Sequence, residues 1–136
     1  MSDAFDPKAP SIRVRGVLVG PQRAVDVLFR LDTGASRTSV RSHILRLAGY
    51  DPSAGQPLRF RSATGIGTGL AVPVRHLVAL DQTRDSFLVI AHDPPPAVIT
   101  DGLLGLDFFR GLVLTLDFAR GRIDLGPSRP WWRPWR

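Results

Sequence analysis

The chain has 136 residues, of which 43% are hydrophobic, and a formal net charge of +6 at pH 7. A chain of this length without an internal repeat predicts a single domain with one packed core. It contains no cysteine, which excludes disulfides, thiol catalysis and zinc–thiolate sites. No run reaches the roughly 18 apolar residues of a membrane span, and residues 1–10 lack the apolar stretch of a signal peptide, so a cytoplasmic protein is expected.

The positive charge comes almost entirely from arginine, since Lys8 is the only lysine. The arginines are scattered along the chain, and pairs such as Arg13 and Arg15 alternate with apolar residues as on a solvated strand face. No clustered basic stripe accompanies them. We therefore expect no nucleic-acid partner; an arginine-rich nucleic-acid binder is the weaker alternative.

The first predicted elements are two strands, at 12–19 and 24–31, joined by a turn at 20–23 that contains glycine and proline. In the second strand the odd-numbered positions from 25 to 31 are all apolar, whereas the even-numbered ones are mixed. This period of two is typical of a strand with one buried face. The two strands form a predicted hairpin that leads directly into Asp32.

A short helix is predicted next. Ser42 is a candidate N-cap, Gly49 stands where a C-terminal cap is expected, and Ile44, Leu45 and Ala48 fall on one face. The chain then returns to β-like runs separated by glycine and proline. Strands are expected at 58–63, 70–80, 87–91, 113–118 and 122–125, with a helical turn at 107–110.

The resulting prediction is an all-β fold with one or two short helices. Its domain would span residues 11–125. Residues 1–10 would form a polar N-terminal extension, and residues 126–136 a C-terminal tail rich in proline, tryptophan and arginine. This tail is expected to pack on its own domain or to stay disordered. Contact with a membrane surface or a partner is the less favoured alternative, because so short a segment lacks the markers of an interfacial helix.

The segment Asp32-Thr33-Gly34-Ala35-Ser36 is the strongest candidate for chemistry. An isolated Asp-Thr-Gly triplet fits a capped turn at the end of a strand. Here it follows an alternating hairpin and precedes two further features in order. One is a glycine-rich segment at 62–70, and the other is Leu103-Leu104-Gly105.

With these three motifs in this order, the sequence resembles the retropepsin family of aspartic proteases, especially their bacterial homologues, over residues 11–125. The resemblance implies a closed β fold, the acid-protease half-barrel, without a metal or organic cofactor. It implies that the segment 62–70 is a flap that closes over an extended peptide. The implied catalytic loop residues are Asp32, Thr33 and Gly34; the implied substrate-binding residues are Ala35, Ser36, Gly65, Ile66 and Gly67; and the implied braces of the loop are Leu103, Leu104 and Gly105.

Peptide hydrolysis by carboxylates needs one group to activate water and another to protonate the carbonyl oxygen. Two carboxylates that lie close together share one proton, because both cannot ionise cheaply. This chain has a single Asp-Thr-Gly, and the downstream Asp101-Gly102 lacks the threonine. We therefore expect a two-fold symmetric homodimer, an aspartic endopeptidase in which each subunit supplies one Asp32.

Several residues near Asp32 depart from the family pattern. Arg30 occupies a place that is usually apolar, and there it could hold both carboxylates ionised. Ser36 and Arg37 stand where retroviral enzymes usually carry acidic residues, so the salt bridges of those enzymes should be missing. Ala35 in place of serine removes a possible donor to the carboxylate, which predicts a pH optimum nearer neutrality. These departures keep an alternative open, a catalytically inactive module that binds a peptide or mediates dimerisation.

The remaining expectations concern single residues. Asp107 is expected to cap the helical turn that follows Gly105. The three histidines lack metal-ligand spacing and receive no role. Apolar substrate pockets are expected around Leu28, Ile66, Val98 and Ile99.

Overall fold

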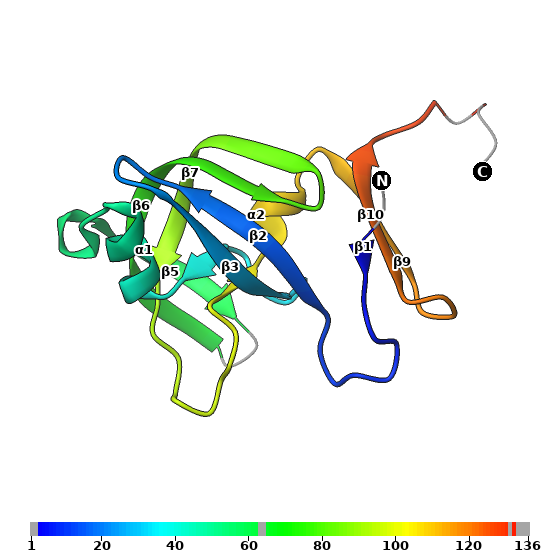
Figure 1. Cartoon of the computed structure of the whole chain (residues 1–136), viewed down its shortest axis with the longest axis horizontal. Helices are drawn as coiled ribbons and strands as arrows, with labels where there is room; N and C mark the ends of the chain where they lie inside the picture. Colours follow the sequence, from blue (N-terminus) through cyan, green and yellow to red (C-terminus); the bar gives the residue numbers. More distant parts are fainter. Residues whose placement is uncertain (1–2, 63–64, 131, 133–136) are drawn as a thin grey trace.

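The computed structural model describes residues 3–62, 65–130 and 132. They form ten strands, two short α-helices and one 3-10 turn (Figure 1). The strands are β1 (Asp3–Ala4), β2 (Arg13–Val19), β3 (Ala24–Leu31), β4 (Ser39–Val40), β5 (Gln56–Ser62), β6 (Gly65–Ala79), β7 (Gln82–Ala91), β8 (Gly102–Leu104), β9 (Leu112–Asp117) and β10 (Arg122–Pro127). The helices are α1 (Ser42–Ala48) and α2 (Leu106–Phe109), and the 3-10 turn is η1 (Pro52–Ala54).

Six strands close into a mixed β-barrel in the order β2-β3-β8-β4-β7-β6, because β6 also pairs with β2. Two of the neighbouring pairs, β3–β8 and β4–β7, are parallel, and the others are antiparallel. Strand β5 extends the sheet beyond β6. The all-β prediction with short helices is thus confirmed, and the two parallel pairs bring segments that are far apart in the sequence next to Asp32.

Buried and exposed side chains alternate along the β2–β3 hairpin, and the buried ones contribute to the core. In β2, Val14 and Leu18 are buried while Arg13 and Arg15 are exposed, and Phe29 of β3 is fully buried. Each buried side chain of this size stabilises the fold by about 1.5–3 kcal/mol. The two arginines lie on a solvated strand face, as predicted.

The start of α1 differs from the sequence-based expectation. Arg41, not Ser42, holds the N-cap position, and it makes no side-chain cap bond. The amide and hydroxyl of Ser42 instead donate to the two carboxylate oxygens of Asp93, at 2.9 and 2.8 Å. A carboxylate from a distant loop therefore satisfies this end of the helix. The predicted C-cap is confirmed, since Gly49 adopts a left-handed conformation with φ 104°.

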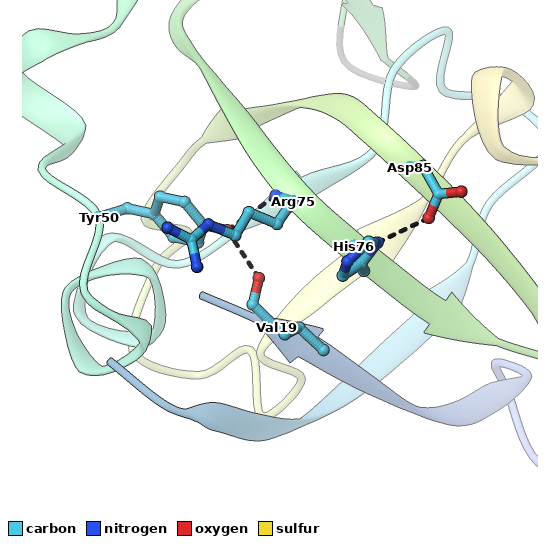
Figure 2. Close-up of polar contacts among 5 residues, drawn as sticks. All are labelled: Val19, Tyr50, Arg75, His76 and Asp85. Carbon is cyan, nitrogen blue, oxygen red and sulfur yellow. Dashed lines mark hydrogen bonds and ion pairs between the residues drawn. The ribbon is translucent and has the colours of Figure 1, made fainter. Parts of the chain in front are cut away.

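Tyr50, which follows α1, links this helix to β2 and β6, the two strands whose pairing closes the barrel. The Tyr50 hydroxyl donates to the Val19 carbonyl at 2.6 Å and accepts from the Arg75 amide at 2.8 Å (Figure 2). Val19 ends β2 and Arg75 lies in β6, so one side chain links both strands of the closure. Beside it, His76 contacts Asp85 across β6 and β7, Nδ1 to Oδ1 at 2.6 Å, as an exposed pair.

A separate three-stranded antiparallel sheet, β1-β10-β9, lies to the right of the barrel in Figure 1. The strands predicted at 113–118 and 122–125 are confirmed as β9 and β10, which pair antiparallel. The strand at Asp3–Ala4, which pairs with Arg122 and Ile123, was not predicted. Of the C-terminal tail, 126–127 belong to β10, whereas residues 131 and 133–136 lie outside the described residues. No helix in the described part of the chain is long and apolar enough to cross a membrane.

Candidate active site

The loop after β3 is fixed to β8 through the backbone. Strand β3 runs parallel to β8, with Leu31 opposite Leu104. The Asp32 amide continues the ladder by donating to the Leu104 carbonyl at 3.0 Å, and the Leu106 amide donates to the Ala35 carbonyl at 2.9 Å. The loop is therefore bonded at one end to Leu104, one of the predicted braces, and at the other end to Leu106, which was not predicted.

The Asp32 carboxylate contacts two donors from its own chain. Its Oδ1 accepts from the Gly34 amide at 2.9 Å, and its Oδ2 accepts from Arg30 Nη2 at 3.3 Å. The side chain of Asp32 keeps 17% of its surface exposed, and Thr33 and Gly34 are exposed outright. A Cβ at Gly34 would lie 3.1 Å from Oδ1, so glycine permits the close turn around the carboxylate.

A buried polar cluster lies beneath this loop. Thr38 is fully buried; its amide and hydroxyl donate to Asp107 Oδ1 at 2.9 and 2.7 Å, and its oxygen accepts from the Gly105 amide at 3.1 Å. We call Thr38, Gly105 and Asp107 the buried bracket. Asp107 was predicted to cap α2, but the N-cap position is Gly105 and makes no side-chain cap bond. The prediction failed because the side chain turns to donors on another segment.

The position of Asp107 has an electrostatic consequence. Burial raises the pKa of its carboxyl, although the hydroxyl and amide of Thr38 and the charge of Arg37 oppose the shift. Its second oxygen, Oδ2, is buried and has no partner of hydrogen-bonding geometry among the described residues. Of the two oxygens of this carboxyl, Oδ1 thus accepts hydrogen bonds, and Oδ2 accepts none among the described residues.

Gly105 shows why this motif requires glycine. A Cβ there would lie 2.6 Å from the Arg37 carbonyl group and 2.9 Å from the Ala35 oxygen. No side chain fits, because the two backbones approach too closely. Leu104 beside it is fully buried, whereas Leu103 faces the cleft described below.

The segment predicted as a flap is the turn end of the β5–β6 hairpin. Arg61 pairs with Ile66, and Ser62 with Gly65, in its register. Residues 63 and 64 of this segment lie outside the described residues. Ser36 joins the Asp32 loop to this hairpin: its amide donates to the Arg61 carbonyl and its hydroxyl accepts from the Arg61 amide, both at 2.9 Å.

A cleft of about 360 Å³ lies between the Asp32 loop, the hairpin and the proline-rich loop after β7. Among the predicted site residues it is lined by Asp32, Ala35, Gly65, Ile66, Gly67 and Leu103, and by the predicted pocket residue Val98. Leu28 and Ile99 do not line it. Leu28 borders a separate hollow beside Asp26 and Asp101.

Several lining residues were not predicted; among them are Phe60, His92 and the prolines 94 and 95. His92 packs edge-on against Phe60, with 6.1 Å between ring centroids. The only sequence signal for His92 is its position at the end of a strand and before three prolines. Its approach to Phe60 depends on the pairing of β7 with β6 and of β6 with β5, which the sequence did not reveal.

The geometry can be compared with that of known proteins. The profile of a family described as aspartyl protease matches residues 12–108, which include the Asp32 loop, the hairpin and Gly105. This chain belongs to the aspartyl protease family. The aspartyl protease is also similar in structure to a retropepsin-like aspartic protease from Rickettsia conorii, with a TM-score of 0.67, 16% identity, and coverage of 93% of this chain and 89% of the other. No curated protein sequence matches it significantly.

The fold of this aspartyl protease is therefore retropepsin-like, and the motifs that carried the resemblance occupy one site. Asp32 lies at the wall of a cleft large enough for side chains of an extended peptide. Its carboxylate can accept a proton or donate one. The loop that carries it is held by backbone hydrogen bonds to Leu104 and Leu106. One carboxylate alone cannot supply both roles at the same time.

Proposed function

We propose that the protein is a homodimeric aspartic endopeptidase, with one Asp32 from each subunit in its active site. The observation that carries the proposal is that Asp32 is the only acidic residue among those that line the cleft in the described structure. A two-carboxylate mechanism therefore needs a second carboxylate from another copy of the chain. The exposure of Thr33 and Gly34 supports a contact at this loop.

In this dimer the two Asp32 carboxylates share one proton. The ionised one removes a proton from a water molecule as the oxygen attacks the peptide carbonyl carbon. The protonated one donates to the carbonyl oxygen. Collapse of the tetrahedral intermediate then breaks the C–N bond, with proton transfer to the leaving nitrogen. Gly34 supports the ionised form through its amide, which donates to Oδ1.

The β1-β10-β9 sheet is the surface best suited to support the dimer. Its outer strands β1 and β9 each have an edge that no described strand pairs. Unpaired strand edges are common sites of association between chains. Next to this sheet, Phe118 is 59% exposed and packs edge-on against Phe5 at 5.5 Å. An apolar group of this kind gains stability when a second subunit covers it.

The test is cleavage of a mixed peptide library, with and without pepstatin, by the wild type and Asp32→Asn. We expect cleavage that pepstatin blocks, and a loss of roughly 10³-fold or more in the variant. The pH–rate profile should have its maximum above pH 3, toward neutral pH. Full activity of a folded Asp32→Asn protein would disprove the assignment of Asp32.

The dimer is tested separately by mixing. Specific activity should fall on dilution as subunits separate, and excess Asp32→Asn chain should inhibit the wild type by forming mixed dimers with a single Asp32. Sedimentation at the same concentrations gives the fraction of dimer. Activity that stays proportional to a sedimenting monomer would contradict the shared site.

A second candidate is a catalytically inactive module that binds peptides in the same cleft. The contact between Arg30 and Asp32 favours it, because a guanidinium so close stabilises the charged form of a carboxylate, and the mechanism needs one proton on the pair. Under this alternative, peptides would bind without being cleaved at any pH, and Arg30→Leu would restore cleavage.

A further inference from the structure

The cleft has an unusual balance of charge for a site that was expected to be apolar. Besides the Asp32 carboxylate, its lining contains the side chains of Arg30, Arg37 and His92. The two arginines are cationic at every physiological pH. The cleft therefore has an excess of positive charge without help from the rest of the chain.

Arg30 is the cation closest to the reacting group. It lies in β3, two residues before Asp32, and its Nη2 lies 3.3 Å from Oδ2 of Asp32. This distance is longer than the 2.7–2.9 Å typical of a charge-assisted hydrogen bond. The Arg30 side chain is also 41% exposed, and Asp32 Oδ2 is its only hydrogen-bond acceptor among the described residues, so other N–H donors of its five can bind a further acceptor.

We propose that Arg30 determines specificity by binding an acidic substrate side chain next to the scissile bond. This inference rests on the proposed peptidase function of the same cleft. An incoming carboxylate can approach the planar guanidinium with two parallel hydrogen bonds, whereas Asp32 makes a single contact with it through Oδ2. Arg30 then exchanges its long contact with Asp32 for a shorter one with the substrate.

Symmetry extends the preference to both sides of the cleaved bond. Two copies of Arg30 flank the pair of Asp32 residues in the proposed dimer. Arg37, which is half-buried and lines the same cleft, adds a second positive charge in each subunit. Extended peptides with glutamate or aspartate beside the scissile bond are thus the substrate class that the cleft fits.

A purely positioning role for Arg30 makes a different prediction. If its guanidinium only steadied the Asp32 carboxylate, replacing it would alter cleavage of all peptides by a similar factor. The ratio between an acidic peptide and its uncharged isostere separates the two roles, because the effect on Asp32 cancels in that ratio.

The experiment uses peptides that differ only by glutamate or glutamine beside the scissile bond, at pH 6, where glutamate is ionised. We expect the wild type to favour the glutamate peptide roughly 10-fold or more in kcat/KM. Arg30→Leu should bring the ratio close to one, and Arg30→Lys should retain part of it. Arg23→Leu is the matched control, since it removes the same charge from an exposed turn at the other end of the hairpin and should leave the ratio unchanged.

The same pair of peptides, made with a reduced, uncleavable bond, measures binding without catalysis. Preference for glutamate in binding, lost in Arg30→Leu, supports the inference even if no peptide is cleaved, an outcome that would overturn only the peptidase. Equal binding and equal cleavage of the two peptides by the wild type would overturn the role of Arg30 and leave the peptidase standing.

Discussion

The two walls of the cleft are built in opposite ways. The Asp32 loop is held by backbone bonds to β8 and by the buried bracket, in which Thr38 is fully buried. The facing hairpin presents Ile66, which is 60% exposed, between two glycines. One wall is fixed by hydrogen bonds in a buried cluster, whereas the other presents an exposed apolar side chain near its turn.

This difference separates the requirements of chemistry from those of binding. A carboxylate that transfers protons must be held in one place, and buried hydrogen bonds do so. In the proposed enzyme, a wall that covers the substrate would move and gain its contacts only when a peptide arrives. Substitutions in the bracket should therefore reduce stability, and substitutions in the hairpin should reduce catalytic efficiency alone.

The largest effect on stability is expected from Thr38→Val. Valine has nearly the same shape but no hydroxyl, so the Gly105 amide loses its acceptor and Asp107 loses one donor in a buried site. The unfolding free energy should fall by about 2–4 kcal/mol, measured by urea denaturation. Thr83→Val, at an exposed position of β7, is the control and should change it by less than about 0.5 kcal/mol. Equal effects of the two would refute the importance of the bracket.

A smaller effect is expected from Ile66→Ala in the hairpin. Because Ile66 is mostly exposed in the free chain, stability should change by less than about 0.5 kcal/mol. The KM for a cleaved peptide should rise roughly 3- to 10-fold, since apolar contact with the bound substrate is lost. Ile99→Ala is a matched control, because Ile99 is 63% exposed but does not line the cleft. A similar rise in KM for both would show that exposure, not position, explains the result.

The smallest expected effect is in Asp107→Asn. It is a change with pH in the unfolding free energy of the variant relative to the wild type. Burial raises the pKa of Asp107 above its ordinary value of 3.8, so the folded state holds this proton more tightly than the unfolded chain. The stability that this group contributes is present below pH 3.8 and is lost as pH rises through the folded pKa. Asparagine does not titrate. The unfolding free energy of the variant, relative to wild type, should therefore increase between pH 3.5 and pH 7, whatever its starting value.

Asp51→Asn supplies a control with the opposite sign. Hydrogen bonds from the Ser53 hydroxyl and amide lower the pKa of Asp51, so this carboxylate stabilises the fold above its ordinary pKa. Its replacement should become relatively less favourable as pH rises. Parallel behaviour of the two variants in urea denaturation would contradict the role of burial at Asp107.

Local pattern was enough to predict much of this protein. Alternation at 24–31 gave the strand before Asp32 because one face of that strand is buried, and Gly49 ended α1 because only glycine adopts its left-handed conformation cheaply. The three motifs in order identified the family, and the position of Arg30 on the Asp32 side of its strand predicted their contact.

Contacts between distant segments were decided only by the tertiary structure. Ser42 and Asp107 have residue types that favour helix caps, yet Asp93 satisfies the first and Thr38 takes the second, because a folded chain offers them better partners than their own helices do. The closure of β2 against β6 and the parallel pairing of β3 with β8 likewise join residues 57 to 73 positions apart. No local pattern encodes such pairings. They bring Arg30, Arg37 and His92 to the lining of the cleft that contains Asp32, and so turn a motif into a charged cleft.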